Sequence, residues 1–225
     1  MTKIALSLLA LAALYPATAG VVVIGNPPDA GTGNCYPFGC TYSGEYQQVY
    51  TASAFTGPIT ISGLEFFNTQ YNSGATSTPT GTYAISLSTT SADWNTLSPT
   101  FASNIGGDNT EVFNASIEQS WAFGDTLTIT FSTPFSYNPG NGNLLLDVVT
   151  DSSNGAEVYF DTNGNSTPNT ILGRVYCDDC TSNGVDNGYG LVTGFVTGSS
   201  TPEPGTMTLA ALGLLGTLAL RRRRS

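Results

Sequence analysis

The sequence predicts an all-β fold, an antiparallel β-sandwich of which a jelly roll is one form. Thr, Ser, Gly, Asn, Tyr, Val and Phe are abundant, and charged residues make up only 10% of the chain, a composition typical of strands and turns. Apolar residues alternate with small or polar ones in segments 83–87 and 127–131, so each would have one buried and one solvated face. Residues that favour turns separate the short apolar segments.

Eight segments have this pattern and are expected to be strands: 46–50, 59–67, 82–88, 126–131, 144–149, 157–160, 172–176 and 191–196. Turns are expected at 72–74, 138–142, 163–165 and 183–184, which are rich in Asn and Gly. Phe66, Phe131 and Phe160 are expected in the core. Trp94 and Trp121 could belong to the core or could stack on a ligand from the surface.

An apolar segment precedes the β-rich region. Lys3 is followed by the apolar run 4–14 and by Ala17-Thr18-Ala19, the small-residue pattern of a cleavage site. The run is too short for a permanent transmembrane helix, which needs about 20 apolar residues. Residues 1–19 are therefore predicted to be a removable signal helix, and residues 20–200 to form the ectodomain.

A second apolar segment lies in residues 201–225. It begins with Pro202-Glu203-Pro204, continues with the mostly apolar residues 206–220, and ends with Arg221, Arg222, Arg223 and Arg224. About 15 helical residues at 1.5 Å rise cover only about 22 Å of a hydrocarbon core of roughly 30 Å. We expect a marginal, short transmembrane helix whose arginines stay on the cytoplasmic side.

This arrangement of motif, short apolar helix and arginine cluster resembles the PEP-CTERM sorting signal of Gram-negative bacteria. The commonest form has Val or a similar residue before the first proline, whereas Thr201 stands here. The resemblance implies recognition and cleavage of the tail by an exosortase, transient contact with the inner membrane, and a final location in the cell envelope or outside the cell. It also implies a setting rich in exopolysaccharide, a candidate partner.

The ectodomain is strongly acidic. Residues 20–200 hold fifteen of the sixteen acidic residues against the one guanidinium of Arg174, which gives a formal charge of −14. Such a surface repels the phosphates of nucleic acids, so nucleic acid is excluded as a partner. It attracts cations, although acidity can also serve solubility alone.

Several kinds of catalysis are excluded by composition. The chain has no histidine, and its one lysine is Lys3, so histidine-based nucleophile systems and Schiff-base lysines are ruled out for the ectodomain. A glycosidase needs two facing carboxylates about 5 to 10 Å apart. Nothing in the sequence pairs any two of Glu65, Glu111, Glu118 and Glu157, and we expect no enzyme.

Four cysteines form two close pairs, Cys35 with Cys40 and Cys177 with Cys180. An exported protein favours disulfides, and three pairings are formally possible. We prefer the two local bridges, which would hold loops rather than greatly stabilise the fold. A redox dithiol at Cys177 and Cys180 is the alternative, but the two aspartates between them disfavour a thiolate.

Calcium is a possible cofactor, because it takes oxygen ligands from flexible loops. Asp161, Asn163 and Asn165 have the required alternate spacing, although an EF-hand would have Gly at Ser166 and Glu at Leu172. Asp-Asn and Asn-Gly runs are equally typical of plain β-turns. A second acidic cluster contains Asp178, Asp179, Asn183, Asp186 and Asn187.

Three functions are compatible with these patterns. The leading hypothesis is a non-catalytic structural or adhesive component of the cell envelope or extracellular matrix. The first alternative is a carbohydrate-binding module, which could depend on calcium and should present exposed aromatic rings beside carboxylates. The second is a carboxylate-based hydrolase.

Overall fold

The structure is a computed structural model that describes residues 20–41, 43–154, 157–165, 167–177 and 183–198. These belong to a compact unit, Ala19–Gly198. The predicted signal helix and the predicted sorting tail lie outside the described residues.

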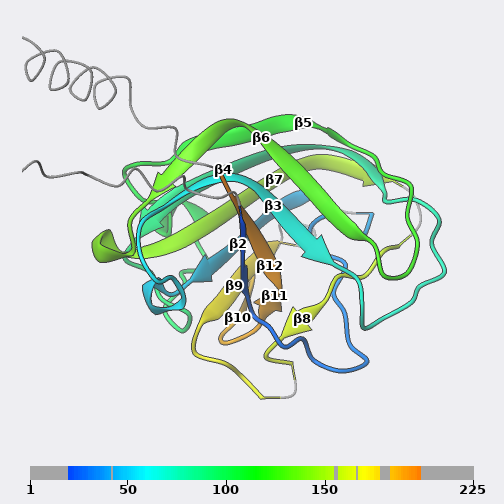
Figure 1. Cartoon of the computed structure of the whole chain (residues 1–225), viewed down its shortest axis with the longest axis horizontal. Helices are drawn as coiled ribbons and strands as arrows, with labels where there is room; N and C mark the ends of the chain where they lie inside the picture. The colour runs from blue at the N-terminus through cyan, green and yellow to red at the C-terminus, as the bar shows by residue number, and fades with distance from the viewer. Residues whose placement is uncertain (1–19, 42, 155–156, 166, 178–182, 199–225) are drawn as a thin grey trace, which may run out of the picture. The chain divides into compact units, whose positions relative to one another are not determined.

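Ten strands form two large antiparallel sheets (Figure 1). The four-stranded sheet has the order β1 (Gly20–Ile24), β12 (Thr193–Thr197), β3 (Ile59–Phe67) and β6 (Thr126–Tyr137). The six-stranded sheet has the order β10 (Asn183–Asp186), β9 (Leu172–Cys177), β2 (Gly44–Tyr50), β7 (Asn143–Asn154), β4 (Thr80–Thr90) and β5 (Thr110–Ile117). β8 (Thr162–Asn163) and β11 (Gly190–Leu191) pair separately, and the 3-10 turns are η1 (Ala52–Ala54), η2 (Phe101–Ser103) and η3 (Pro139–Asn141).

The pairing of the strands is nested. The four consecutive strands β8, β9, β10 and β11 (Thr162 to Leu191) are called the β8–β11 insertion here. Without them, eight of the twelve described strands remain. The first of them pairs with the last (β1 with β12), the second with the seventh (β2 with β7), the third with the sixth (β3 with β6), and the fourth with the fifth (β4 with β5). Every one of these pairs is antiparallel. The chain therefore crosses repeatedly from one sheet to the other, which brings distant segments together.

The predicted all-β, antiparallel fold is confirmed, with differences in detail. Segment 157–160 is not a strand: it forms an isolated bridge, in which Asn34 and Phe160 exchange backbone hydrogen bonds. Residues 183–184, expected as a turn, belong to β10. Segment 191–196 is divided between β11 and β12 because the backbone N–H of Val192 turns aside to Asp161.

Four strands were missed: β1, β5, β8 and β10. β1 is a run of valines without alternation, β5 is rich in polar residues, and β8 and β10 have only two and four residues. Each lies at the edge of a sheet. Edge strands bury less of their surface, so their sequences have a weaker apolar pattern.

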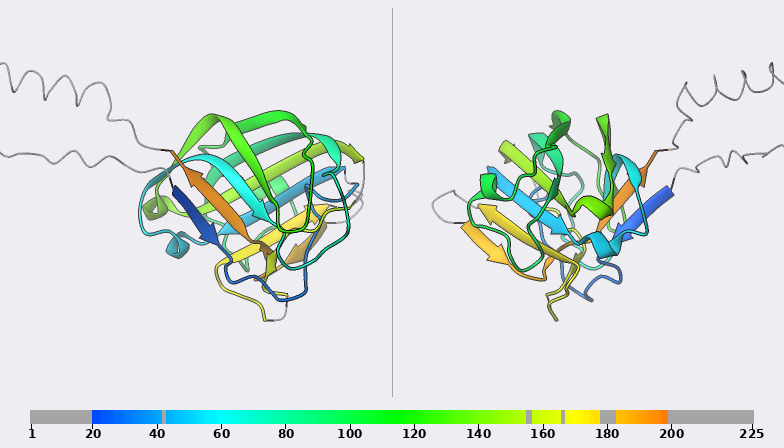
Figure 2. Two further views of the ribbon diagram at one scale, coloured as in Figure 1. Left: turned by 45° about the vertical axis from the view of Figure 1, so that its right-hand side comes forward. Right: turned by 90° about the vertical axis from the view of Figure 1, so that its left-hand side faces the viewer.

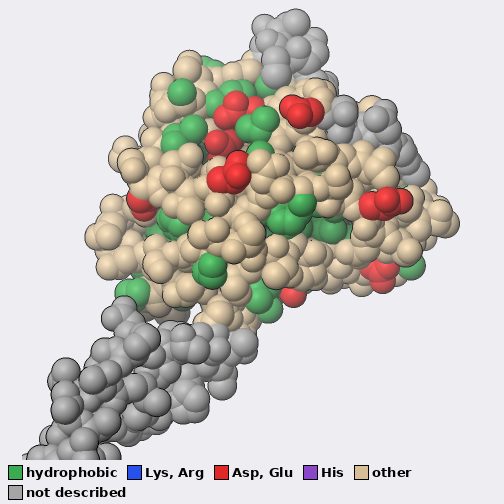
Figure 3. Space-filling model, turned by 90° about the horizontal axis from the view of Figure 1, so that it is seen from above, with side chains coloured by type: hydrophobic (Ala, Val, Ile, Leu, Met, Phe, Trp, Pro, Cys, Tyr) green, Lys and Arg blue, Asp and Glu red, His purple; other side chains and the backbone are tan. Residues whose placement is uncertain are grey.

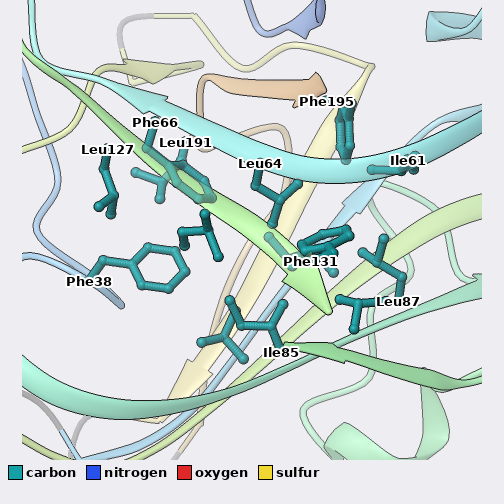
Figure 4. Close-up of a cluster of buried hydrophobic side chains, with 14 of the residues drawn as sticks. Phe38, Ile61, Leu64, Phe66, Ile85, Leu87, Leu127, Phe131, Leu191 and Phe195 are labelled. Carbon is teal, nitrogen blue, oxygen red and sulfur yellow. The ribbon is translucent and has the colours of Figure 1, made fainter. Parts of the chain in front are cut away.

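One hydrophobic core lies between the two sheets and draws on both (Figure 4). In β3, Ile61, Leu64 and Phe66 are all fully buried. Residues 61 and 64 would face opposite sides of a regular strand. A register shift between Ile61 and Gly63 turns both inward, as a bulge does by adding one residue to the strand.

The structure shows which of the aromatic residues considered above lie in the core. Phe66, Phe131 and Phe160 are buried as predicted. Trp121 also belongs to the core, where its ring meets that of Phe160 edge-on at 5.5 Å. Trp94 is half-buried.

A disulfide joins Cys35 to Cys40 and closes a short loop. The loop inserts Phe38 into the core, with its ring centroid 4.8 Å from that of Phe66. Gly39 lies directly against the Val158 carbonyl, because a Cβ there would stand 1.9 Å from that oxygen. Cys177 is also disulfide-bonded, and its predicted partner, Cys180, lies outside the described residues.

We predict that Gly39→Ala lowers the free energy of unfolding by about 1–3 kcal/mol, the usual cost of an added methyl group in a packed site. The matched control is Gly107→Ala, because nothing lies within 4 Å of a Cβ at that position. The control should be neutral or stabilising by up to about 1 kcal/mol, since alanine restricts the unfolded chain. Urea denaturation measures both, and equal stability of the two variants would contradict the packing described.

Candidate functional site

A hollow of about 300 Å³ opens between the β3–β4 loop and the segment before β8. Its lining includes Tyr71, Glu157 and Tyr159. The two tyrosine ring centroids are 4.7 Å apart with an interplanar angle of 54°. The Tyr159 hydroxyl donates to Glu157 Oε2 at 2.7 Å, and Tyr71 remains 45% exposed. The hollow thus offers exposed aromatic surface and hydrogen-bonding groups side by side.

Asp161 holds the loop that carries Tyr71. Its carboxylate is buried and accepts hydrogen bonds from the Thr69 N–H at 2.7 Å, the Thr69 hydroxyl at 2.6 Å and the Gln70 N–H at 3.0 Å. Bonds to a charged acceptor are among the stronger ones in proteins. Tyr71 directly follows this clamp, so its position does not depend on the loop alone.

A turn completes the loop beyond Tyr71. The Asn72 side chain accepts from the Gly74 N–H at 2.9 Å, an Asx turn. Gly74 has φ of +74°, a conformation that glycine adopts without strain. Gly74 lines the hollow, and the sequence predicted this turn from its Asn-Ser-Gly run.

Hydrogen bonds to the Cys35–Cys40 loop and to Asn34, the residue before it, hold the backbone on either side of Tyr159. Its neighbours Val158 and Phe160 donate backbone hydrogen bonds to Gly39 and Asn34 at 2.7 and 2.9 Å. Gly33 lies against the bases of both side chains, since a Cβ there would stand 2.9 Å from Tyr159 Cβ and 3.2 Å from Tyr71 Cβ. The pair of rings is therefore built on rigid support, which preorganises the hollow.

The electrostatics of the hollow disfavour anions. The hydrogen bond to Glu157 raises the pKa of Tyr159 above its usual value, with smaller contributions from burial and from the charge of Glu157. The Tyr159 hydroxyl therefore keeps its proton at neutral pH. The surface is acidic beyond the hollow as well: on the face that Figure 3 presents, Asp and Glu and no Lys or Arg are visible among the described side chains. An uncharged ligand meets no repulsion here, whereas an anionic one does.

The residues predicted to bind calcium have separate partners. Asp161 clamps residues 69–70, as above. Asn163 donates through Nδ2 to the Pro27 carbonyl at 2.8 Å and accepts through Oδ1 from Asn169 at 2.7 Å. The backbone N–H of Asn165 donates to Asp29 at 2.6 Å. Within the described ranges, no three His, Cys, Asp or Glu side chains gather as metal ligands do.

Arg174 is buried and contacts Asp186 of the second acidic cluster. Its guanidinium lies between the rings of Tyr176 and Tyr189, at 4.7 and 4.4 Å from their centroids. Its Nε and Nη2 both reach Asp186 Oδ2 at 2.8 Å. Asn183 is in β10 and Asn187 lines a polar hollow beside Arg174, while Asp178 and Asp179 lie outside the described residues. Arg174 thus anchors β10 and the turn after it.

A pair of carboxylates that the sequence did not reveal lies between β2 and β7. Glu45 and Asp147 are diagonal neighbours across the two strands. Burial, followed by the charge of Asp147 and a hydrogen bond with it, raises the pKa of Glu45 to about 7. Burial also raises the pKa of Asp147. Strand register produces this pair, because the two residues are about a hundred positions apart in sequence.

The carboxylates that the sequence singled out are dispersed. Glu157 lines the tyrosine hollow, and Glu118 lines a different hollow between β5 and β6. Glu65 is in β3 and Glu111 is in β5, on different sheets. Each of three hollows in the described part of the molecule has one carboxylate residue among its lining residues.

Comparison with known proteins bears on the C-terminal end. Residues 200–224 match the family model of the PEP-CTERM protein-sorting motif. The chain carries a PEP-CTERM sorting motif. The predicted resemblance is thereby confirmed. Neither the curated proteins nor the solved structures gave a match to this chain.

The PEP-CTERM motif is a sorting signal recognised by an exosortase, which implies export to the cell envelope or the extracellular space. The match covers only the tail, so the ligand of the ectodomain has to be argued from the ectodomain. None of the helical segments in the described ranges is long and apolar enough to cross a membrane.

We predict that Asp161→Ala lowers the free energy of unfolding by about 3 kcal/mol, because it leaves two backbone N–H groups and a hydroxyl without their charged acceptor. Asp151→Ala removes an exposed carboxylate and is the control, with an expected change within about 0.5 kcal/mol. The loss at Asp161 should be equal with calcium and with a chelator. If calcium stabilised only the unsubstituted protein, Asp161 would be a calcium ligand instead.

Proposed function

We propose that this PEP-CTERM protein is a non-catalytic, adhesive component of the cell envelope or extracellular matrix. In this proposal a jelly-roll β-sandwich ectodomain holds polysaccharide through the tyrosine hollow. The observation that carries the proposal is the exposed pair of rings, Tyr71 and Tyr159, beside Glu157 in a hollow of about 300 Å³.

The nested strand pairing supports the jelly-roll assignment. Pairing of first with last, second with seventh, third with sixth and fourth with fifth is what results when a long antiparallel ribbon is rolled into two sheets. β9 and β10 extend one sheet, the β8–β11 insertion supplies Arg174 and Tyr189, and Asp161 directly precedes it. The scaffold is a common one, so the function is argued from the hollow alone.

The hollow has the features of a carbohydrate site. Aromatic faces stack on the apolar C–H faces of sugar rings, and carboxylate or hydroxyl groups take the hydrogen bonds of the sugar hydroxyls. Tyr71 supplies the exposed face, and Glu157 and Tyr159 supply the polar groups. A volume of about 300 Å³ is at the low end for small-ligand sites, which suits one sugar unit of a chain.

The ligand class follows from charge. An ectodomain with a formal charge of −14 repels polymers rich in uronic acid or sulfate. We infer that the partner is a neutral polysaccharide. Binding at single sugar units would be weak, and a matrix polymer would gain from repeated contacts along its length.

A non-catalytic role is supported by the placement of the carboxylates. Glycoside hydrolysis needs two carboxylates on opposite sides of the bond, and Glu157 is the one carboxylate residue among those lining the tyrosine hollow. Glu45 and Asp147 are in hydrogen-bonding contact, closer than that mechanism requires.

We predict that Tyr71→Ala weakens binding to a neutral polysaccharide about tenfold, which corresponds to about 1.4 kcal/mol of lost stacking. Phe123→Ala is the matched control, because Phe123 is an aromatic residue with 50% exposure elsewhere on the surface. Affinity electrophoresis of the folded variants in gels containing neutral or uronic-acid polymers measures the effect. Equal retardation of the Tyr71 and Phe123 variants would refute the hollow as the site.

Sorting is tested separately. Replacing Pro202, Glu203 and Pro204 by alanine should leave the protein at the inner membrane at its unprocessed size, because the exosortase loses its recognition motif. Immunoblots of fractionated cells follow both size and location. Unchanged processing and location would refute exosortase sorting without affecting the binding proposal.

A further inference from the structure

The two large sheets leave four edge strands, β1, β6, β5 and β10. An edge strand presents unpaired backbone groups to any other strand, and proteins usually blunt such edges with prolines, charges, short length or covering contacts. The four edges of this domain can be compared on these criteria.

β5 and β6 protect each other. They are consecutive in the chain and belong to opposite sheets, and the Ser132 hydroxyl of β6 donates to the Val112 carbonyl of β5 at 3.1 Å. β6 also contains Pro134, and β5 exposes Glu111. The contact with β6, the proline and the charged side chain each make these two edges less accessible to another strand.

β10 is blunted in a different way. It has four residues, Asn183–Asp186, including Gly184. Asp186 at its end is partly exposed and carries a charge. Short length and an acidic residue both discourage pairing with a second acidic chain.

β1 lacks two of these features. It has five residues, and its sequence, Gly-Val-Val-Val-Ile, contains no charged side chain and no proline. Among the residues that the structure describes, it pairs with β12 alone, and Figure 2 shows it at the outer edge of its sheet beside β12. Val21 and Val23 are 44% and 41% exposed, whereas Val22 and Ile24 pack against the core.

We propose that β1 is a dimerisation strand, which pairs antiparallel with β1 of a second copy of this chain and joins the two four-stranded sheets. Centred on Val22, this pairing sets Val21 of each copy opposite Val23 of the other. The four exposed valines then form one apolar cluster on the outer face. The inference goes beyond polysaccharide binding and does not depend on it.

The protection of the other edges favours a second copy of this chain as the partner that pairs with β1. Because β5, β6 and β10 are protected in every copy, β1 is the one edge of the two large sheets, as described, that is left for β1 of another copy to pair with. The contact is then isologous and closes as a two-fold dimer rather than growing into a fibre. Two domains of charge −14 repel each other, and a strand without acidic side chains adds least to that repulsion where the copies meet.

A cysteine at the centre tests the pairing in the full exported chain. Opposed residues in an antiparallel pair have Cα atoms about 4.5–5.5 Å apart, within the range that a disulfide spans. Val22→Cys should therefore give a reducible covalent dimer on non-reducing gels of whole cells. Val185→Cys on the β10 edge, where Val185 is 36% exposed, is the control and should stay monomeric.

A charge tests the same contact without a cysteine. Val23→Lys should abolish the dimer, whereas Val185→Lys should not. When Val23→Lys is added to the Val22→Cys variant, the cross-linked band should disappear. When it is made in the otherwise unsubstituted chain, the mass measured by light scattering should halve. A monomeric mass for the unsubstituted protein, equal cross-linking at positions 22 and 185, or a cross-linked band of a different protein would each overturn the proposal. Circular dichroism melting of the Val23→Lys variant confirms that it remains folded.

Discussion

The burial of aromatic and aliphatic side chains between the two sheets is the constraint on which the rest of this structure depends. Most apolar side chains of the described domain point into that one layer, and each large one contributes roughly 1.5–3 kcal/mol of transfer free energy. The bulge in β3 exists because this layer has to be filled. Without the shift between Ile61 and Gly63, either Ile61 or Leu64 would face water.

The tyrosines in that layer bring hydroxyl groups that need partners. Tyr50 hydrogen-bonds to Thr193 across the two sheets at 2.7 Å, and Tyr46 donates to Gln48 at 2.5 Å. Gln48 then holds β11, because its amide both donates to and accepts from the Leu191 backbone at 2.8 Å. Satisfying the buried polar groups therefore also docks the β8–β11 insertion onto the sheet.

The same principle builds the tyrosine hollow. Asp161 is a buried charge, and such a group is stable only when it is well hydrogen-bonded. Its bonds are made to the backbone and hydroxyl of residues 69–70, so its burial also positions Tyr71. Arg174 does for β10 what Asp161 does for the β3–β4 loop. Two buried charges of opposite sign thus hold segments at the edge of the domain, the β3–β4 loop and β10, through hydrogen bonds rather than through core packing.

The sequence alone determined the fold class, the exclusion of histidine and lysine chemistry, and the sorting motif, because these depend on composition, local periodicity and short contiguous patterns. It predicted strand 59–67 with its correct bounds, since both ends are marked by turn residues and apolar alternation. Tertiary structure decided what Asp161 does, which tyrosines meet, and that Glu45 lies beside Asp147. Each of these contacts joins segments far apart in the chain, and register across the sheets, which no local pattern encodes, brings them together. The edge position of β1 was likewise decided by strand order, which gives a plain run of valines its exposed face.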